Sequence, residues 1–177
     1  MTPDIRYPIG KFQPPATTLT ARERSDMIDS IAEVPARLRA AVQGLSESQL
    51  DTPYRPGGWS VRQVVHHVPD SHLNAYMRFK LALTEERPTI RPYDEAKWAE
   101  LDDARTAPIG MSLSLLDALH LRWVTMLRTI EEKQFEGTII HPATGEMTLG
   151  RLLALYSWHG RHHTAHITAL REQMKWA

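Results

Sequence analysis

The feature that most restricts the fold of this chain is a histidine-rich segment near the C-terminus, where four of the nine histidines occur within eight positions. The segment lies inside an apolar pattern of helical period, which predicts a helix from about 148 to 174. At about 100° per residue, His159 and His163 share the apolar side of this helix. His162 points away from that side, and His166 lies at its margin. Because a buried imidazole without a partner costs about 1–3 kcal/mol, the inward pair needs partners inside the fold.

Three further segments place apolar residues at alternating spacings of three and four, which is typical of helices that pack in a bundle. They predict helices over about 20 to 44, 60 to 84 and 112 to 133. Pro35 and Pro69 interrupt the first two, where we expect a kink or a late helix start. Together with the C-terminal helix, these segments predict an all-α fold, a four-helix bundle.

The connecting segments carry further signals. Residues 1–18 contain four prolines and no helical period, so they predict an extended N-terminal arm laid over the body. Residues 85 to 110 are polar and contain three prolines, which suits a long crossover connection with one short helix around 95 to 101. Residues 138–147 predict a small hairpin before the last helix. No internal repeat divides the chain, so we expect a single domain over residues 1–177.

Composition argues against several classes of function. The 21 basic and 21 acidic side chains give a formal net charge of zero, which argues against nucleic acid as a partner. The absence of cysteine excludes disulfides, a Cys-ligated metal and a Cys nucleophile. The chain starts without an apolar signal region and nowhere runs through about 18 apolar residues, so we expect a cytoplasmic protein with no membrane partner.

Two of the C-terminal histidines predict a metal site. His159 and His163 lie one helical turn apart, so both imidazoles can bind the same ion. The alternative is two separately hydrogen-bonded core histidines, which we consider less suited to a pair stacked on one face. Three histidines with an open coordination position are typical of a catalytic site, whereas structural sites close all four positions with protein ligands. Imidazole suits several divalent metals, so the ligand type alone does not fix the ion.

The third ligand is expected from the helix predicted over 60 to 84. His66 and His67 are adjacent and point about 100° apart, so they cannot both face the site. Periodicity leaves His67 and His72 open as candidates. His120, on the third predicted helix, is a further candidate, although we expect a buried, hydrogen-bonded role for it.

Two blocks of this sequence resemble the signatures of the DinB/YfiT-like metalloenzyme family. The blocks are residues 56–67 (PGGWSVRQVVHH), followed by Asp70-Ser71-His72, and residues 159–163 (HGRHH). Further similarity lies in residues 7–10, 78–84 and 141–142, so the resemblance covers nearly the whole chain and is closest to the YfiT branch. It implies a four-helix bundle with a three-histidine site for a divalent metal.

The resemblance also implies the ligands. The first falls on His67, eight residues after the tryptophan of the first block, and the other two fall on His159 and His163. Periodicity selects the C-terminal pair as well, but the choice of His67 over His72 rests on the resemblance. Pro69 departs from the family pattern, where an ordinary helix former is usual. The family further implies one zinc or nickel ion per chain and a homodimer.

Two activities are implied for such a site. A metal-dependent hydrolase uses metal-bound water as the nucleophile. In H-E-x-x-H metalloproteases a glutamate base follows the first histidine, whereas Gly160 follows His159 here, so a more distant acid such as Asp70 would have to replace it. A low-molecular-weight thiol such as bacillithiol needs no such base, because a coordinating cation readily deprotonates it. We therefore expect a thiol S-transferase, with a hydrolase second and a non-catalytic metal-binding stress protein third.

For other side chains near the two blocks, the sequence supports only general expectations. Three arginines could bind a carboxylate of the thiol or of another small-molecule substrate, although solvated helix faces are the simpler expectation for them: Arg62, Arg78 and Arg161. Trp59 and Trp158 are expected to belong to the core. His162 and His166 either support the ligands or face solvent.

Overall fold

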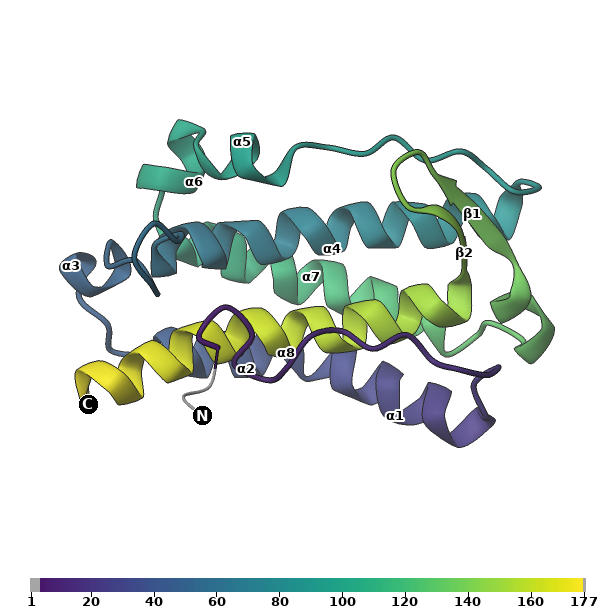
Figure 1. Ribbon diagram of the computed structural model, residues 1–177, viewed down its shortest axis with the longest axis horizontal. Helices are drawn as coiled ribbons and strands as arrows, with labels where there is room; N and C mark the ends of the chain where they lie inside the picture. Colours follow the sequence, from purple (N-terminus) through teal and green to yellow (C-terminus); the bar gives the residue numbers. More distant parts are fainter. Residues whose placement is uncertain (1–3, 177) are drawn as a thin grey trace.

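The computed structural model describes residues 4–176 of the chain. Its elements in chain order are α1 (Ala21–Ala32), α2 (Val34–Val42), α3 (Glu47–Leu50), α4 (Val61–Thr84), α5 (Glu95–Ala99), α6 (Asp102–Thr106), α7 (Ile109–Leu127), the 3₁₀ helix η1 (Glu132–Glu136), β1 (Thr138–His141), β2 (Gly145–Thr148) and α8 (Leu149–Met174). Four long rods make up the body, formed by α1 with α2, by α4, by α7 and by α8 (Figure 1). The predicted four-helix bundle is confirmed.

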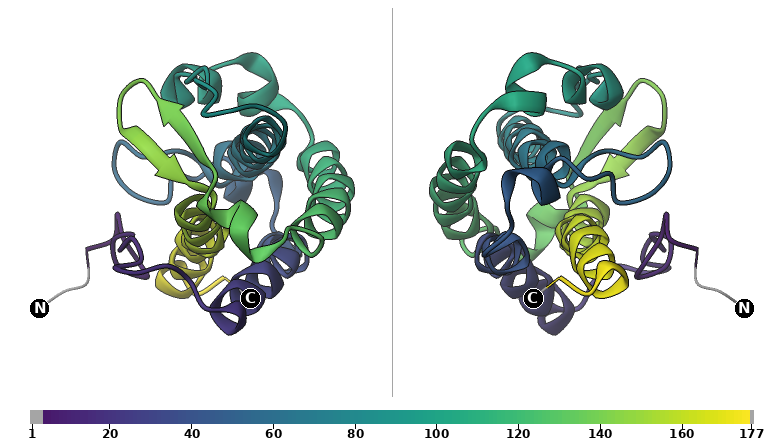
Figure 2. Two further views of the ribbon diagram at one scale, coloured as in Figure 1. Left: turned by 90° about the vertical axis from the view of Figure 1, so that its right-hand side faces the viewer. Right: turned by 90° about the vertical axis from the view of Figure 1, so that its left-hand side faces the viewer.

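The four rods stand at the corners of the bundle when it is viewed along its axis (Figure 2). α4 packs against α7 and α8, and the rod made of α1 and α2 packs against the same two helices, so it lies diagonally opposite α4. α4 and α7 run parallel, as do α8 and the α1–α2 rod, whereas α4 and α8 are antiparallel (Figure 1). Because parallel neighbours cannot be joined by a short turn, the chain returns along the whole of α4 through α5 and α6 before α7 begins.

Side-chain caps fix where three of the rods begin. Thr20 and Ser60 accept hydrogen bonds from the backbone N–H groups three residues further on. Glu23 and Gln63 accept in return from the backbone N–H of the capping residue, which completes a capping box at each helix. Thr148 caps α8 directly from the end of β2. The hairpin and the last helix are therefore joined without a linker.

The two prolines predicted to interrupt helices have different outcomes. Pro35 lies in the first turn of α2, and the first rod breaks at Glu33, as expected. Pro69 is buried in the middle of α4, and the helix continues through it. Since a proline removes one N–H···O bond of the helix, the packing of α4 on α7 and α8 must hold it together at this point.

Two element boundaries differ from the prediction. The short helix expected around 95 to 101 is divided into α5 and α6, with Leu101 in extended conformation between them. The helix predicted over 112 to 133 spans Ile109–Leu127 instead, although its apolar spacing continues to Ile130. The backbone tightens into i→i+3 turns at Thr129 and Ile130, which lets the chain leave the bundle toward η1 and the hairpin.

The hairpin and the core complete the body. β1 and β2 pair antiparallel with Ile139 opposite Met147, and Ile139 is buried, so the predicted hairpin is confirmed. At the centre of the bundle the largest fully buried side chains include Trp123 and Phe79. No helix among residues 4–176 is both long enough and apolar enough to cross a membrane.

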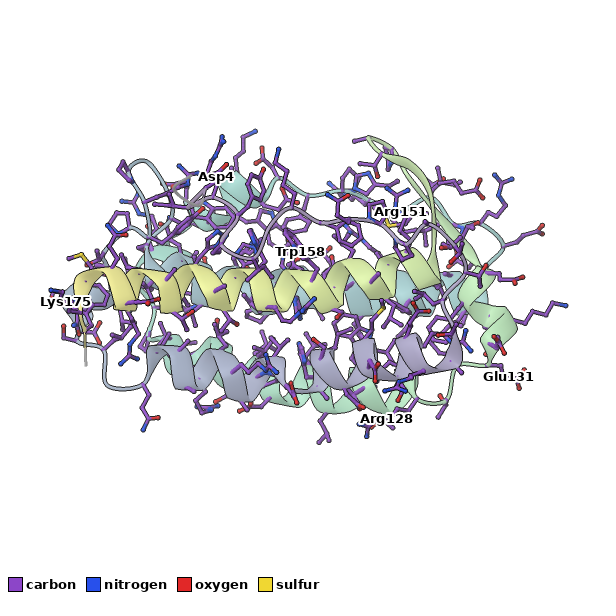
Figure 3. All side chains as sticks on the ribbon, turned by 60° about the horizontal axis from the view of Figure 1, so that its bottom comes forward. Asp4, Arg128, Glu131, Arg151, Trp158 and Lys175 are labelled. Atoms are coloured by element: carbon purple, nitrogen blue, oxygen red, sulfur yellow. The ribbon has the colours of Figure 1, made fainter. Side chains whose placement is uncertain are left out.

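The predicted N-terminal arm runs beside α8 from residue 4 onward without helix or strand, and residues 1–3 lie outside the described part of the chain. Trp158 lies on the side of α8 that faces the arm (Figure 3), and its Nε1–H donates to the Gly10 carbonyl at 3.2 Å. Phe12 packs against the same indole, with ring centroids 6.0 Å apart. The arm is thus attached to the helix that carries the histidine-rich segment.

Candidate metal centre

Three histidines from two antiparallel helices come together between α4 and α8. His67 lies on α4, and His159 and His163 lie one turn apart on α8. One ring nitrogen of each lies within 4.8 Å of those of the other two, and the ring centroids are 4.5 to 5.4 Å apart. Within residues 4–176, this is the only group of three or more such side chains that could hold a metal ion. We call these three residues the histidine cluster.

Two of the three rings in the cluster lack hydrogen-bond partners among the described residues. His67 and His163 make no hydrogen bond to any described residue, although Nδ1 of His163 is buried. His159 donates or accepts through Nδ1 toward His72, while its Nε2 has only the Ser71 hydroxyl near it, at 3.4 Å. Buried polar atoms are rarely left in this state unless something absent from the protein chain satisfies them.

The electrostatic surroundings keep the cluster neutral. Burial lowers the pKa of His67 to about 4. Burial, and then the neighbouring imidazoles, hold the pKa values of His159 and His163 well below the usual value for histidine. At pH 7 the three rings are therefore uncharged, and each has a ring nitrogen with a lone pair. This donor set fits a divalent metal, because imidazole must be deprotonated to bind one.

The structure distinguishes among the candidates for the third metal ligand. His67 joins the cluster, whereas His72 is fully buried and uses both ring nitrogens in hydrogen bonds. Its Nδ1 lies 2.8 Å from Nε2 of His120, and its Nε2 lies 3.1 Å from Nδ1 of His159. His120 is buried and hydrogen-bonded, as expected, with its Nδ1 2.8 Å from the Ile31 carbonyl oxygen. Neither His72 nor His120 has a nitrogen left for a metal.

His66 faces another part of the structure. Its Nδ1 lies 2.7 Å from the Ser112 hydroxyl, and its Nε2 lies 3.1 Å from the Ala107 carbonyl oxygen. Both groups belong to the start of α7 and the segment just before it. The side chain is buried and fully hydrogen-bonded, so it joins α4 to α7 rather than contributing to the cluster.

The other two histidines of α8, His162 and His166, are buried rather than exposed to solvent, although His162 points away from the bundle interior as expected. The N-terminal arm covers this side of the helix, which periodicity alone cannot reveal. His162 lies between the rings of Tyr7 and Trp158, with centroid distances of 6.0 and 4.2 Å. Nε2 of His166 lies 3.1 Å from the Arg6 carbonyl oxygen. These contacts give both residues a role in seating the arm.

Trp59 and Trp158, predicted to belong to the core, are half-buried at its edge. The ring of Trp59 lies 4.7 Å from that of His67 and 6.3 Å from that of His163, between centroids. Trp59 therefore forms one wall of the histidine cluster while its other side packs against the apolar core. An aromatic wall of this kind excludes water and offers a contact surface to a small molecule.

Gly160, which takes the place of the base in the metalloprotease motif, points away from the cluster. A Cβ at this position would lie 2.5 Å from Cγ2 of Val34 and 3.3 Å from Cε1 of His72. The residue is buried where α8 approaches α2 closely. No side chain at position 160 could reach the cluster as a base, and even a methyl group there would collide with Val34.

Polar side chains not recognised from the sequence lie beside His159. Ser71 lies one turn after His67 on α4, and the ring of Tyr156 is 5.4 Å from that of His159. The hydroxyl of Tyr93, from the crossover segment, is buried and has no hydrogen-bond partner among the described residues. Ser71, Asn74 and Arg78 follow His67 at helical spacings of four, three and four, a pattern that could have identified this face of α4.

Asp70 is the more distant acid expected to replace the missing glutamate base. Its side chain is half-buried, and burial raises the pKa of this carboxyl to about 6, with the nearby Asp103 adding to the effect. It does not belong to the histidine cluster. Asp70 could therefore exchange a proton near neutral pH without ligating a metal.

The three arginines near the blocks have different environments. Arg62 is buried and forms ion pairs with Glu47 and Asp51, so it holds α3 and the following turn against α4. Arg161 is exposed and donates from Nε to the Ser157 carbonyl oxygen. Arg161 therefore lies on a solvated helix face, as expected, whereas the expectation is wrong for Arg62, which is buried by its ion pairs.

Arg78 differs from both. It is half-buried, forms no ion pair with any described acid, and donates from Nη1 to the Tyr156 hydroxyl at 3.4 Å. It lines a cavity of about 630 Å³ together with Asn74, Arg91 and Tyr93. An unpaired guanidinium beside a tyrosine that contacts His159 gives this end of the α4–α8 interface a positive charge for an anionic group.

Residues 30–167 match the family model described as the DinB superfamily. A protein of Bacillus mycoides (strain KBAB4) named "Putative metal-dependent hydrolase" is 54% identical over 173 residues, which cover 98% of this chain and 99% of that protein. A protein of the same name from Bacillus cereus (strain ZK / E33L) is 54% identical over 177 residues, with the same coverage.

Solved structures agree with the fold. YfiT from Bacillus subtilis, described as "a probable metal-dependent hydrolase with an unusual four-helix bundle topology", is 51% identical and superposes with a TM-score of 0.95, covering 98% of this chain and 99% of that one. TT2238, described as a four-helix bundle protein, superposes with a TM-score of 0.56 at 17% identity over 84% of this chain and 98% of its own. The second likeness concerns the fold alone.

Proposed function

This chain belongs to the DinB superfamily, and on that premise we propose that it is an enzyme in which His67, His159 and His163 hold one divalent metal ion, zinc or nickel. The observation that carries the proposal is the convergence of three neutral imidazoles whose ring nitrogens have almost no partners in the protein. Three protein ligands leave a coordination position for a small molecule, as in catalytic rather than structural sites.

We propose that the small molecule is a low-molecular-weight thiol and that the reaction is thiol transfer to an electrophilic carbon. When bound, the cation would lower the pKa of a coordinated thiol, as metals do for thiol ligands. In the overall reaction the S–H proton passes to solvent, a sulfur–carbon bond forms, and the leaving group departs with the electron pair of its bond to carbon. The chain need supply no strong base for this reaction, which agrees with the lack of a carboxylate in the histidine cluster.

The residues of this chain would bind and orient the thiol. Trp59 provides an aromatic wall beside His67 and His163, which excludes water from one side of the cluster. Arg78, two turns beyond Ser71 on the same face of α4, provides an unpaired positive charge for a carboxylate of the thiol. The Tyr156 hydroxyl accepts from Arg78, and the Tyr156 ring contacts that of His159, so Tyr156 connects the guanidinium to the cluster.

Hydrolysis is a second candidate because relatives over nearly the full length carry that name. One structural observation favours it: the pKa of the Asp70 carboxyl, raised to about 6, suits a general base near neutral pH. Asp70 lies one turn after His67 on α4, next to the residue that contacts His159. In this reaction water would attack the electrophilic carbon, Asp70 would accept a proton from that water, and the leaving group would depart with the electron pair of its bond to carbon.

A thermal-shift experiment distinguishes the two reactions. Zinc-loaded protein is mixed with bacillithiol as the thiol probe or with acetohydroxamate as the probe for a hydrolytic site, and proton release is followed in weak buffer. Thiol transfer predicts a higher Tm and proton release with bacillithiol, and faster thiol consumption in the presence of monochlorobimane than without protein. Stabilisation by the hydroxamate alone, with no acceleration of the thiol reaction, would favour the hydrolase.

The role of Arg78 has its own test. Arg78→Met should raise the KM for bacillithiol about tenfold with little change for a thiol that lacks carboxylates, because one charge-assisted hydrogen bond contributes about 1.5–3 kcal/mol. Arg161→Met is the matched control, since Arg161 is exposed and bonds only to its own helix. Equal effects of the two substitutions would remove Arg78 from the proposal. We further propose that the active form is a homodimer, which sedimentation of the intact protein would test.

A further inference from the structure

Behind the histidine cluster lies a line of hydrogen-bonded imidazoles that leads into the core. The Ile31 carbonyl oxygen is 2.8 Å from Nδ1 of His120. Nε2 of His120 is 2.8 Å from Nδ1 of His72, and Nε2 of His72 is 3.1 Å from Nδ1 of His159. The line crosses the bundle from α1 through α7 and α4 to α8. His72 is 0% exposed and His120 is 2% exposed, so water does not compete for these bonds.

The line begins at a carbonyl whose usual helical donor is missing from the sequence. In a continuous helix the Ile31 oxygen would accept from the N–H of residue 35, but residue 35 is proline and has no N–H. The first rod breaks at Glu33 for the same reason, which turns the end of α1 toward α7. The break at Pro35 therefore supplies the hydrogen-bond acceptor for His120.

The carbonyl fixes the direction of every bond in the line. A carbonyl oxygen can only accept, so Nδ1 of His120 must carry its proton and, in the neutral ring, Nε2 of His120 must accept. His72 must then donate from Nδ1 and accept at Nε2, and His159 must donate from Nδ1. The rings of both His120 and His72 are almost entirely shielded from water, which favours their neutral form. The outcome is that Nε2 of His159 has no proton.

We propose that His72 and His120 are positioning residues that fix His159 as its Nδ1–H tautomer, so that Nε2 is presented to the metal of the histidine cluster. The proposal rests on the proposed metal site and adds how one of its ligands is prepared. Without the line, neutral histidine favours a proton on Nε2, and that form cannot bind a metal through this atom. Partners of this kind fix the ring orientation and tautomer of metal-binding histidines and raise metal affinity.

The packing around His72 holds the line in place. The rings of Trp123 and Tyr156 meet His72 edge-on, with centroids 5.6 and 5.4 Å away. Gly160 allows α8 to approach, since a Cβ there would lie 3.3 Å from Cε1 of His72. The nearest alternative partner for the metal-facing atom of His159 is the Ser71 hydroxyl at 3.4 Å, which can donate to Nε2 when no metal is bound.

The direct test is ¹⁵N–¹H NMR of histidine side chains in the metal-free full-length protein, in which two-bond and three-bond couplings distinguish the two tautomers. The proposal predicts the Nδ1–H tautomer for all three residues of the line: His120, His72 and His159. An Nε2–H tautomer at His159 would overturn the proposal, and so would a mixture of the two forms. Because no metal is present, this result does not depend on whether the cluster binds one.

Substitutions test the consequence for metal binding. His120→Leu removes the acceptor for His72 and should give mixed tautomers at His159, with Zn²⁺ affinity about tenfold lower in competition with a chromophoric chelator. His120→Gln keeps an oxygen that can accept from His72, so it should retain most of the affinity. His66→Leu is the matched control, because it too removes a buried histidine with two hydrogen bonds, in this case on α4, and His66 makes no hydrogen bond to the line.

The results for these variants distinguish the positioning role of His72 and His120 from metal binding by the cluster. Full Zn²⁺ affinity in His120→Leu, with the control unchanged, would overturn the positioning role while leaving the metal site intact. Loss of affinity in His66→Leu equal to that in His120→Leu would also overturn it, since the effect would then be general destabilisation. If the NMR tautomers are as expected but wild-type protein binds no Zn²⁺, the proposed function fails and the line of hydrogen bonds stands.

Discussion

The histidine cluster and the pair His72 and His120 are built from the same side chain and lie next to each other, yet their hydrogen bonding is opposite. In the pair, every ring nitrogen has a partner at 3.1 Å or less. In the cluster, His67 and His163 have none among the described residues. The pKa values of His67 and His120 are both lowered to about 4, so burial alone does not distinguish them. The imidazoles of the pair therefore hold helices together, whereas His67 and His163 keep ring nitrogens available for a ligand.

The largest predicted difference between the two regions is in their contribution to the free energy of unfolding. His72→Leu removes the partners of His120 Nε2 and His159 Nδ1 inside the core, so we expect the free energy of unfolding of metal-free protein to fall by about 4 kcal/mol. His67→Leu removes no hydrogen bond and should change it by less than about 1 kcal/mol in either direction. Urea unfolding of the two variants measures both. Equal losses would mean that the cluster and the pair do not differ as described.

Acidification should destabilise both the cluster and the pair, because both contain buried neutral imidazoles. The pKa of His67 falls from 6.5 to about 4 on folding, so the unfolded chain takes up a proton at a higher pH than the folded one. Stability contributed by the neutral ring is fully present above pH 6.5 and is lost as the pH falls toward 4, by about 3 kcal/mol for this group. Urea unfolding at several pH values, with metal removed, should show a shallower pH dependence in His67→Leu. An unchanged slope would contradict the assignment of His67 as a buried neutral ring.

A smaller effect is expected at the contact that lets α8 approach both regions. Gly160→Ala gains about 1 kcal/mol of helix propensity, but its Cβ would lie 2.5 Å from Cγ2 of Val34. Overpacking of this kind typically costs about 1–3 kcal/mol, so we expect a net loss of about 1 kcal/mol. Val34→Ala in the same chain should remove most of the penalty specific to the added methyl group. A Gly160→Ala protein more stable than wild type, by thermal unfolding, would show that the close approach is not needed.

The sequence predicts the rods and much of the site for physical reasons that are local. The spacing of apolar residues locates four amphipathic helices, and the same periodicity places His159 and His163 on one inner face. It could not decide between His67 and His72, because the phase of α4 relative to α8 is set by tertiary packing. Only the family resemblance pointed to His67, and the structure brings that residue into the cluster.

What could not be predicted depends on segments far apart in the chain. His162 is covered by Tyr7 of the N-terminal arm, a contact between residues that no periodicity connects. The line through His120 needs a carbonyl from α1, and only the position of Pro35 hints that this carbonyl is free. The apolar spacing continues to Ile130, beyond the observed end of α7, because apolar side chains can pack in tight turns as well as in helices.

The measurement that tests the central claim most directly is the metal content of wild type and His159→Ala after loading with Zn²⁺ and gel filtration, with His66→Ala as the matched control. Three converging imidazoles predict one ion per chain in wild type and in the control, and less than about a tenth of that in His159→Ala, because two remaining ligands bind zinc weakly. A full equivalent of zinc retained by His159→Ala would contradict the account.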